Sequence, residues 1–71
     1  ANVKEGSLAQ SKADFAAKLS IALKEAGETE YWLELLHESD YIEENAFTSI
    51  YTDNKELIKI LTSILKTTRN Q

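Results

Sequence analysis

Hydrophobic residues recur at helical spacing from Ser11 to Glu38 and predict one long helix there. Placed at about 100° per residue, they fall into two sectors of the helix surface rather than one. One stripe contains Phe15, Leu19, Ala22, Ala26 and Leu33, and a second sector contains Ala17, Ile21, Trp32 and Leu35. A helix that is apolar on two sides packs between several neighbours. The pattern therefore predicts an inner helix of a bundle.

The residues before this helix indicate where it begins. Ser11 is followed three residues later by Asp14, a spacing at which the hydroxyl caps the helix and the carboxylate lies at the positive end of its dipole. Gly6 is typical of the left-handed residue that ends a helix. We therefore expect residues 1–6 to be the end of a preceding helix and residues 11–38 to be the long helix.

A second helix is predicted for residues 45–68. The polar connection from Ser39 to Glu44 is short, which makes consecutive helices antiparallel neighbours. The apolar side of this helix carries Phe47, Ile50, Tyr51, Leu57, Ile58, Leu61, Ile64 and Leu65. The opposite side carries Lys55, Glu56, Lys59, Ser63, Lys66 and Thr67. The expected fold class is all-α, an antiparallel helical hairpin.

Some of the apolar and aromatic residues are expected to form the core or an interface with further helices. They are Phe15, Leu19, Ala22, Ala26, Trp32, Leu33, Ile50, Leu57, Leu61 and Ile64. Aromatic side chains at this spacing favour packing anchors over platforms for stacking bases, because no Arg is interleaved with them. Ala22 and Ala26 are small enough to let another backbone approach closely.

A two-helix hairpin is a small unit to stand alone. Ordering 71 residues costs on the order of 100 kcal/mol, at about 1.5 kcal/mol per residue, and a hairpin buries only one side of each helix. We therefore expect either self-association into a homo-oligomer or a further helical segment that completes the core. The chain contains no Met, so we also expect residues 1–71 to be a single helical domain within a longer chain.

Composition narrows the class of protein. Hydrophobic residues make up 42% of the chain and charged residues 28%, as in ordinary soluble proteins. The lack of Cys excludes disulfide bonds and Cys-based zinc sites. No apolar run approaches the roughly 18 residues of a membrane span and no signal-peptide pattern is present, so the expectation is a cytoplasmic protein without membrane contact.

Charge is unevenly distributed along the chain. Nine acidic residues and no Lys or Arg lie between Glu25 and Asn54, whereas the Lys and Arg residues lie in the two flanking segments. Folding the hairpin places those basic segments side by side, opposite the acidic connection. Such segregation is most often a solvated surface. The functional alternatives are head-to-tail steering between subunits and contact of the basic end with phosphates.

Two sets of residues have spacings that suggest a chemical site. Glu34 and His37 have the Glu-x-x-His spacing of di-iron bundles, but such sites need several of these pairs and the chain has a single His, so no metal is predicted. Glu25 and Glu28 lie beside the second apolar sector, which predicts at least one half-buried carboxylate that needs a donor from another helix or subunit. No nucleophile or base accompanies them, so neither an enzyme nor a cofactor is predicted.

Three segments resemble one known protein family, the four-helix bundle or 23S rRNA intervening-sequence protein family. Residues 1–6 (Ala-Asn-Val-Lys-Glu-Gly) resemble the Asn-Ile-Ala-Glu-Gly signature that ends the family's second helix. Ile21–Leu33 resembles the signature of its third helix, and Lys55–Thr62 is similar to its fourth. The segments occur in the family's order and spacing.

The resemblance implies an up-and-down four-helix bundle of which this chain is the second half. It also implies a ring-shaped homopentamer, as in family members of known assembly. One branch of the family serves diversity-generating retroelements and binds a reverse transcriptase and nucleic acid. The function expected here is a non-enzymatic self-association or interaction module, with an accessory nucleic-acid or reverse-transcriptase-binding protein as the alternative.

Overall fold

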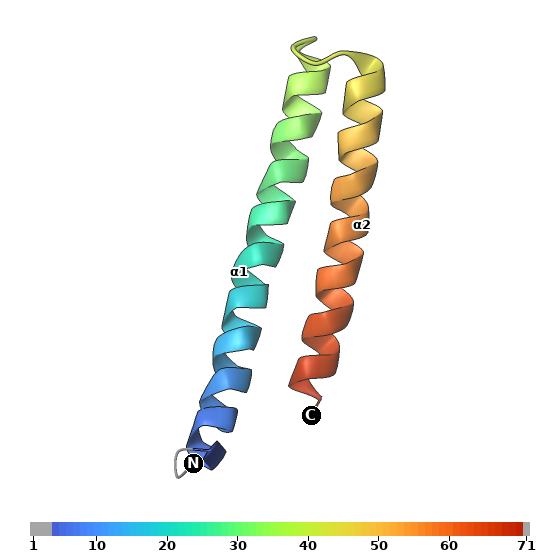
Figure 1. Ribbon diagram of the computed structural model, residues 1–71. Coiled ribbons are helices and arrows are strands. Elements are labelled where there is room, and N and C mark those ends of the chain that lie inside the picture. Colours follow the sequence, from blue (N-terminus) through green and yellow to red (C-terminus); the bar gives the residue numbers. More distant parts are fainter. Residues whose placement is uncertain (1–3, 71) are drawn as a thin grey trace.

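The protein folds as two antiparallel helices joined by a short turn, as predicted (Figure 1). The computed structural model describes residues 4–70, with side chains described from Ser11 to Asn70. Helix α1 spans Lys4–Glu38, helix α2 spans Glu44–Arg69, and the described part of the chain contains no strand. The hairpin measures 56 × 17 × 15 Å, the dimensions of an elongated rod.

The start of α1 differs from the prediction. The helix runs from Lys4 through Gly6 and Ser11 without a break, so the predicted helix end at Gly6 and the predicted capped start at Ser11 are wrong. A Gly inside a helix costs only about 1 kcal/mol relative to Ala, and the following residues contain no Pro to stop the helix. The part of the prediction that concerns residues 1–3 lies outside the described residues.

A Schellman motif ends α1, in agreement with the predicted end at Glu38. The backbone N–H of Tyr41 donates to the carbonyl of Leu36 at 2.8 Å, and that of Asp40 donates to His37 at 3.1 Å. Asp40 has φ 61°, the left-handed conformation that this motif requires. Helix α2 then begins within one residue of its predicted start, where the Glu43 carboxylate accepts from the backbone N–H of Asn45 at 2.8 Å.

The two helices meet along a seam whose positions advance by alternating steps of three and four residues. This seven-residue repeat is that of a coiled coil. The seam of α1 comprises Ala16, Leu19, Leu23, Ala26, Glu30, Leu33 and His37. The seam of α2 comprises Phe47, Tyr51, Asn54, Ile58, Leu61, Leu65 and Thr68. Every one of these residues is buried or partly buried, and the rings of His37 and Phe47 stack with centroids 3.9 Å apart at the loop end.

The seam buries little apolar surface. Among the described residues, only Leu19, Ala26, Leu33 and Leu65 are buried apolar side chains. Many large apolar residues remain exposed: Phe15, Ile21, Tyr31, Trp32, Leu35, Leu36, Tyr41, Ile50, Leu57, Ile60 and Ile64. The core of the single hairpin is therefore one side chain thick, and much of its apolar surface faces outward.

Candidate interaction surface

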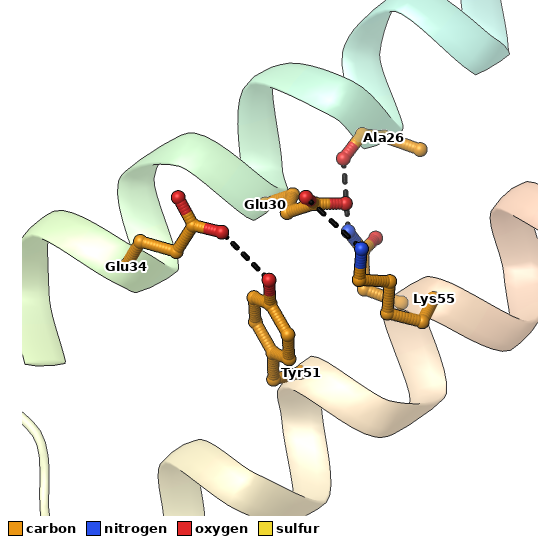
Figure 2. A network of polar contacts seen from close by, with 6 residues as sticks. Ala26, Glu30, Glu34, Tyr51 and Lys55 are labelled. Carbon is orange, nitrogen blue, oxygen red and sulfur yellow. Dashed lines mark hydrogen bonds and ion pairs between the residues drawn. The ribbon is translucent and has the colours of Figure 1, made fainter.

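Polar contacts join the helices along one edge of the seam. The Tyr51 hydroxyl donates to the Glu34 carboxylate at 2.6 Å, and the Lys55 ammonium donates to the Glu30 carboxylate at 3.3 Å (Figure 2). Further along, the Arg69 guanidinium donates to the Ser20 hydroxyl at 3.3 Å. We call the side of the hairpin where these contacts lie the polar edge. In each of these contacts, a side chain of one helix is hydrogen-bonded to a side chain of the other.

The environment of Tyr51 changes the acidity of its phenol. Its hydrogen bond to Glu34, the burial of its ring and the negative charge of Glu30 all favour the neutral phenol. Together they raise the pKa of Tyr51 from 10.0 to about 12. The hydroxyl is thus a fixed hydrogen-bond donor at neutral pH and does not provide a nucleophile.

Asn54 is the buried polar residue of the seam. Its side-chain amide donates to the backbone carbonyl of Ala26 at 2.9 Å, and its exposed fraction is only 9%. A buried polar group in a coiled-coil seam favours an alignment in which it is hydrogen-bonded, because burial without a partner is costly. The alignment of α1 against α2 is therefore set close to this bond.

The opposite edge of the seam carries no such polar links between the described side chains. In an antiparallel coiled coil, the g positions of the two helices lie on the same side of the seam. Each g position comes directly before a seam residue at an a position. These positions are Ala22, Thr29 and Leu36 on α1 and Ile50, Leu57 and Ile64 on α2, and we call them the apolar edge. Leu36, Ile50, Leu57 and Ile64 are 40%, 45%, 46% and 38% exposed. Next to them lie the more exposed Trp32 and Ile60.

The residues expected in the core or an interface therefore separate into three groups. Leu19, Ala26 and Leu33 are buried in the seam, and Ala22 and Leu61 are partly buried. Phe15, Trp32, Ile50, Leu57 and Ile64 are exposed, and the hairpin does not use them as core. Phe15 is next to the seam residue Ala16 and lies seven residues before Ala22, so it continues the exposed row of the apolar edge.

Glu25 and Glu28 are both exposed in the single hairpin, so their predicted half-burial against another helix or subunit stays a prediction. They lie on the side of α1 that faces away from α2. On α1, the described carboxylates that accept hydrogen bonds from α2 side chains other than its first turn are Glu30 and Glu34, which lie at the seam and its polar edge. Asn54 was missed by sequence reasoning, although counting seven residues from Phe47 or Leu61 reaches it.

Glu34 and His37 do not share a ligand site. Glu34 accepts from Tyr51, while His37 Nε2 lies 2.7 Å from Glu44 Oε1. Between Ser11 and Asn70, no group of three or more His, Asp or Glu side chains is placed to hold a metal ion. Neither described helix is long and apolar enough to cross a membrane. An open hollow beside Phe15 is lined only by neighbouring residues of α1.

Taken together, these features define a small all-helical hairpin with one edge satisfied by polar contacts and the other apolar and open. Residues 1–63 match the family described as 23S rRNA-intervening sequence protein, and the chain belongs to this family. No curated protein and no solved structure matches the chain. The family is not a known enzyme family.

Proposed function

We propose that the chain is a non-enzymatic helical module that associates with further copies of itself through its apolar edge. The observation that carries this proposal is the combination of a thin seam with an open row of Leu and Ile side chains. Burying apolar surface stabilises a protein by about 25 cal/mol per Å². Side chains that remain 38–46% exposed in the hairpin can bury a substantial further apolar area against a partner, which stabilises the complex.

The spacing of the open row supports helices as the covering structure. Ile50, Leu57 and Ile64 repeat every seven residues, as do Ala22, Thr29 and Leu36. A seven-residue repeat matches the packing period of another helix. Two further helices on this edge would complete an up-and-down four-helix bundle, which is the context that the proposal assigns to the hairpin. In a longer chain, a preceding helical segment would occupy the same edge.

The proposal is tested by measuring the mass of the 71-residue chain in solution. Size exclusion with light scattering should give a multiple of 8.0 kDa at micromolar concentration. Leu57→Glu places a charge on the apolar edge and should shift the mass toward that of a monomer. Lys59→Glu introduces the same residue two positions away on the exposed polar side and should leave the mass unchanged. A well-folded wild-type monomer would contradict the proposal.

One observation favours nucleic-acid binding as a second candidate. Lys24, Lys59, Lys66 and Arg69 are all exposed and gather toward the open end of the hairpin, away from the acidic turn. Contacts of such side chains with phosphates release counterions, so binding weakens steeply as salt rises. A salt-dependent shift of RNA or DNA that disappears when Lys55, Lys59 and Lys66 are changed to Glu would support this candidate, and no shift at low salt would end it.

A further inference from the structure

Helix α1 carries a second seven-residue repeat on the surface that faces away from α2. Its positions advance by alternating steps of four and three residues, as those of the seam do. They are Ile21, Glu25, Glu28, Trp32 and Leu35, and we call them the outer row. All five are exposed in the hairpin, with Ile21 and Trp32 at 57%. A row with this repeat matches the packing period of a further helix.

The corresponding row of α2 has a different character. At the same distance from the seam, it consists of Ser49, Asp53, Glu56, Ile60 and Ser63, and all but Ile60 are polar. Such a row is typical of a helix surface that faces water. The outer row of α1 instead has apolar residues at both of its ends, so α1 has apolar surface on opposite sides. This is the pattern of a helix packed between two neighbours.

The middle of the outer row indicates the charge of the helix that would cover it. Glu25 and Glu28 lie between Ile21 and Trp32. Among the side chains described from Ser11 to Asn70, no ion pair includes either carboxylate. A covering helix with apolar residues alone would bury both charges without partners, which is costly. Cations at the centre of that helix would remove this cost by pairing with the carboxylates.

Trp32 favours a cation at the same place. It lies four residues after Glu28, the spacing that makes side chains on a helix neighbours. The ring of Tyr31 contacts the indole edge to face, with centroids 5.6 Å apart, so the two rings form one aromatic surface. The face of an indole attracts Arg and Lys side chains. An Arg that pairs with Glu28 would therefore also contact Trp32.

A second copy of this hairpin does not offer the complementary helix. The exposed cations of α2 lie in a row with Thr residues, which contains no large apolar side chain: Thr48, Thr52, Lys55, Lys59, Thr62, Lys66 and Arg69. The apolar edge, in turn, contains no cation. A second outer row would place carboxylates opposite Glu25 and Glu28, where like charges repel.

We propose that the outer row of α1 binds a helix of a different protein. That helix packs apolar residues against Ile21, Trp32 and Leu35 and places Arg or Lys side chains against Glu25 and Glu28. The outer row is distinct from the apolar edge, so the inference goes beyond the proposed self-association and does not depend on it.

A pair of synthetic helices tests this proposal. Each has about 21 residues, which is three seven-residue repeats, with Leu at every seam position except two neighbouring central ones. The Arg peptide carries Arg at those two positions and the Glu peptide carries Glu. Neither contains Trp, so Trp32, the single Trp of the chain, reports binding through its fluorescence. The Arg peptide should shift the Trp32 emission to the blue and saturate, and the Glu peptide should bind at least about tenfold more weakly.

Reversing one charge of the outer row should reverse this preference. Glu28→Lys should bind the Glu peptide more tightly than the Arg peptide. Glu56→Lys makes the same change in the corresponding row of α2 and should keep the preference for the Arg peptide. Both positions are exposed, so neither substitution disturbs the packing of the hairpin.

The other outcomes separate this inference from the proposed function. Leu57→Glu should bind the Arg peptide as tightly as the wild type, because it changes the apolar edge and not the outer row. An unchanged Trp32 emission with the Arg peptide, or an unchanged preference in Glu28→Lys, overturns the inference and leaves self-association intact. A loss of self-association in Glu28→Lys, measured by light scattering, also overturns it, because another copy would then occupy the outer row.

Discussion

At the residue scale, the seam holds polar side chains where they have a partner on the other helix. Glu30 and Tyr51 occupy seam positions that an apolar residue would usually fill, and each is satisfied by a neighbour across the seam or at its edge. Asn54 reaches a backbone carbonyl rather than a side chain. Burial of such groups is tolerated because their hydrogen bonds replace those with water. The same groups then make the alignment of the hairpin specific.

Tyr51 makes the free energy of unfolding of the hairpin depend on pH in the alkaline range. Its pKa is about 12 in the folded chain against 10.0 for the free side chain, so the folded state holds the proton more tightly. The resulting stabilisation is fully present below about pH 10 and is lost as the pH rises from about 10 to about 12. We expect the free energy of unfolding to fall less over this window in Tyr51→Phe than in the wild type, measured by urea unfolding at several pH values.

Tyr41→Phe is the matched control for that measurement. Tyr41 is 81% exposed, and its hydroxyl makes no hydrogen bond within the described residues. Comparing the two variants separates the effect of Tyr51 from the effects of every group that both variants share. Parallel pH profiles for wild type and Tyr51→Phe would show that the hydrogen bond to Glu34 does not hold the phenol proton.

At the scale of the elements, the helices follow from local patterns, but their contacts do not. The end of α1 and both ends of α2 were predicted within a residue from periodicity and the polar connection. The prediction that Gly6 ends a helix is wrong, because the free-energy cost of Gly within a helix is small compared with the gain from continuing a long helix. The sequence also offered two apolar sectors on α1, and only pairing with α2 selects the one that contains Leu19, Ala26 and Leu33.

The end of α1 carries a conformational cost that a single substitution should relieve. Asp40 adopts φ 61°, which Gly adopts freely and other residues adopt at a cost. We expect Asp40→Gly to raise the free energy of unfolding by about 0.5–1 kcal/mol, measured by urea unfolding. Asp40→Ala controls for the loss of charge in the acidic turn, because Ala removes the charge but keeps the Cβ that disfavours a positive φ. If Ala stabilised the chain as much as Gly, charge repulsion rather than backbone conformation would be the cause.

At the scale of the whole molecule, the hairpin is a pair of helices with one apolar side uncovered. Its polar edge is closed by links between its own helices, whereas its apolar edge repeats the seven-residue pattern of the seam without a helix to receive it. The number of apolar residues in the sequence predicts that one hairpin alone cannot bury them all. It did not locate the open edge, because the edge is defined by which residues α1 and α2 leave uncovered once they pair.

Two substitutions of Leu by Ala should distinguish the closed seam from the open edge. Leu33 is 7% exposed within one hairpin, so Leu33→Ala should cost roughly 2–5 kcal/mol by leaving a cavity. Leu57 is 46% exposed within one hairpin, so Leu57→Ala acts mainly on association. The stability of an assembled chain rises with its concentration. Urea unfolding at several protein concentrations should therefore show that Leu57→Ala weakens this dependence, while Leu33→Ala lowers stability at every concentration. Equal effects of the two substitutions, with no influence of concentration, would mean that the apolar edge stays open to water.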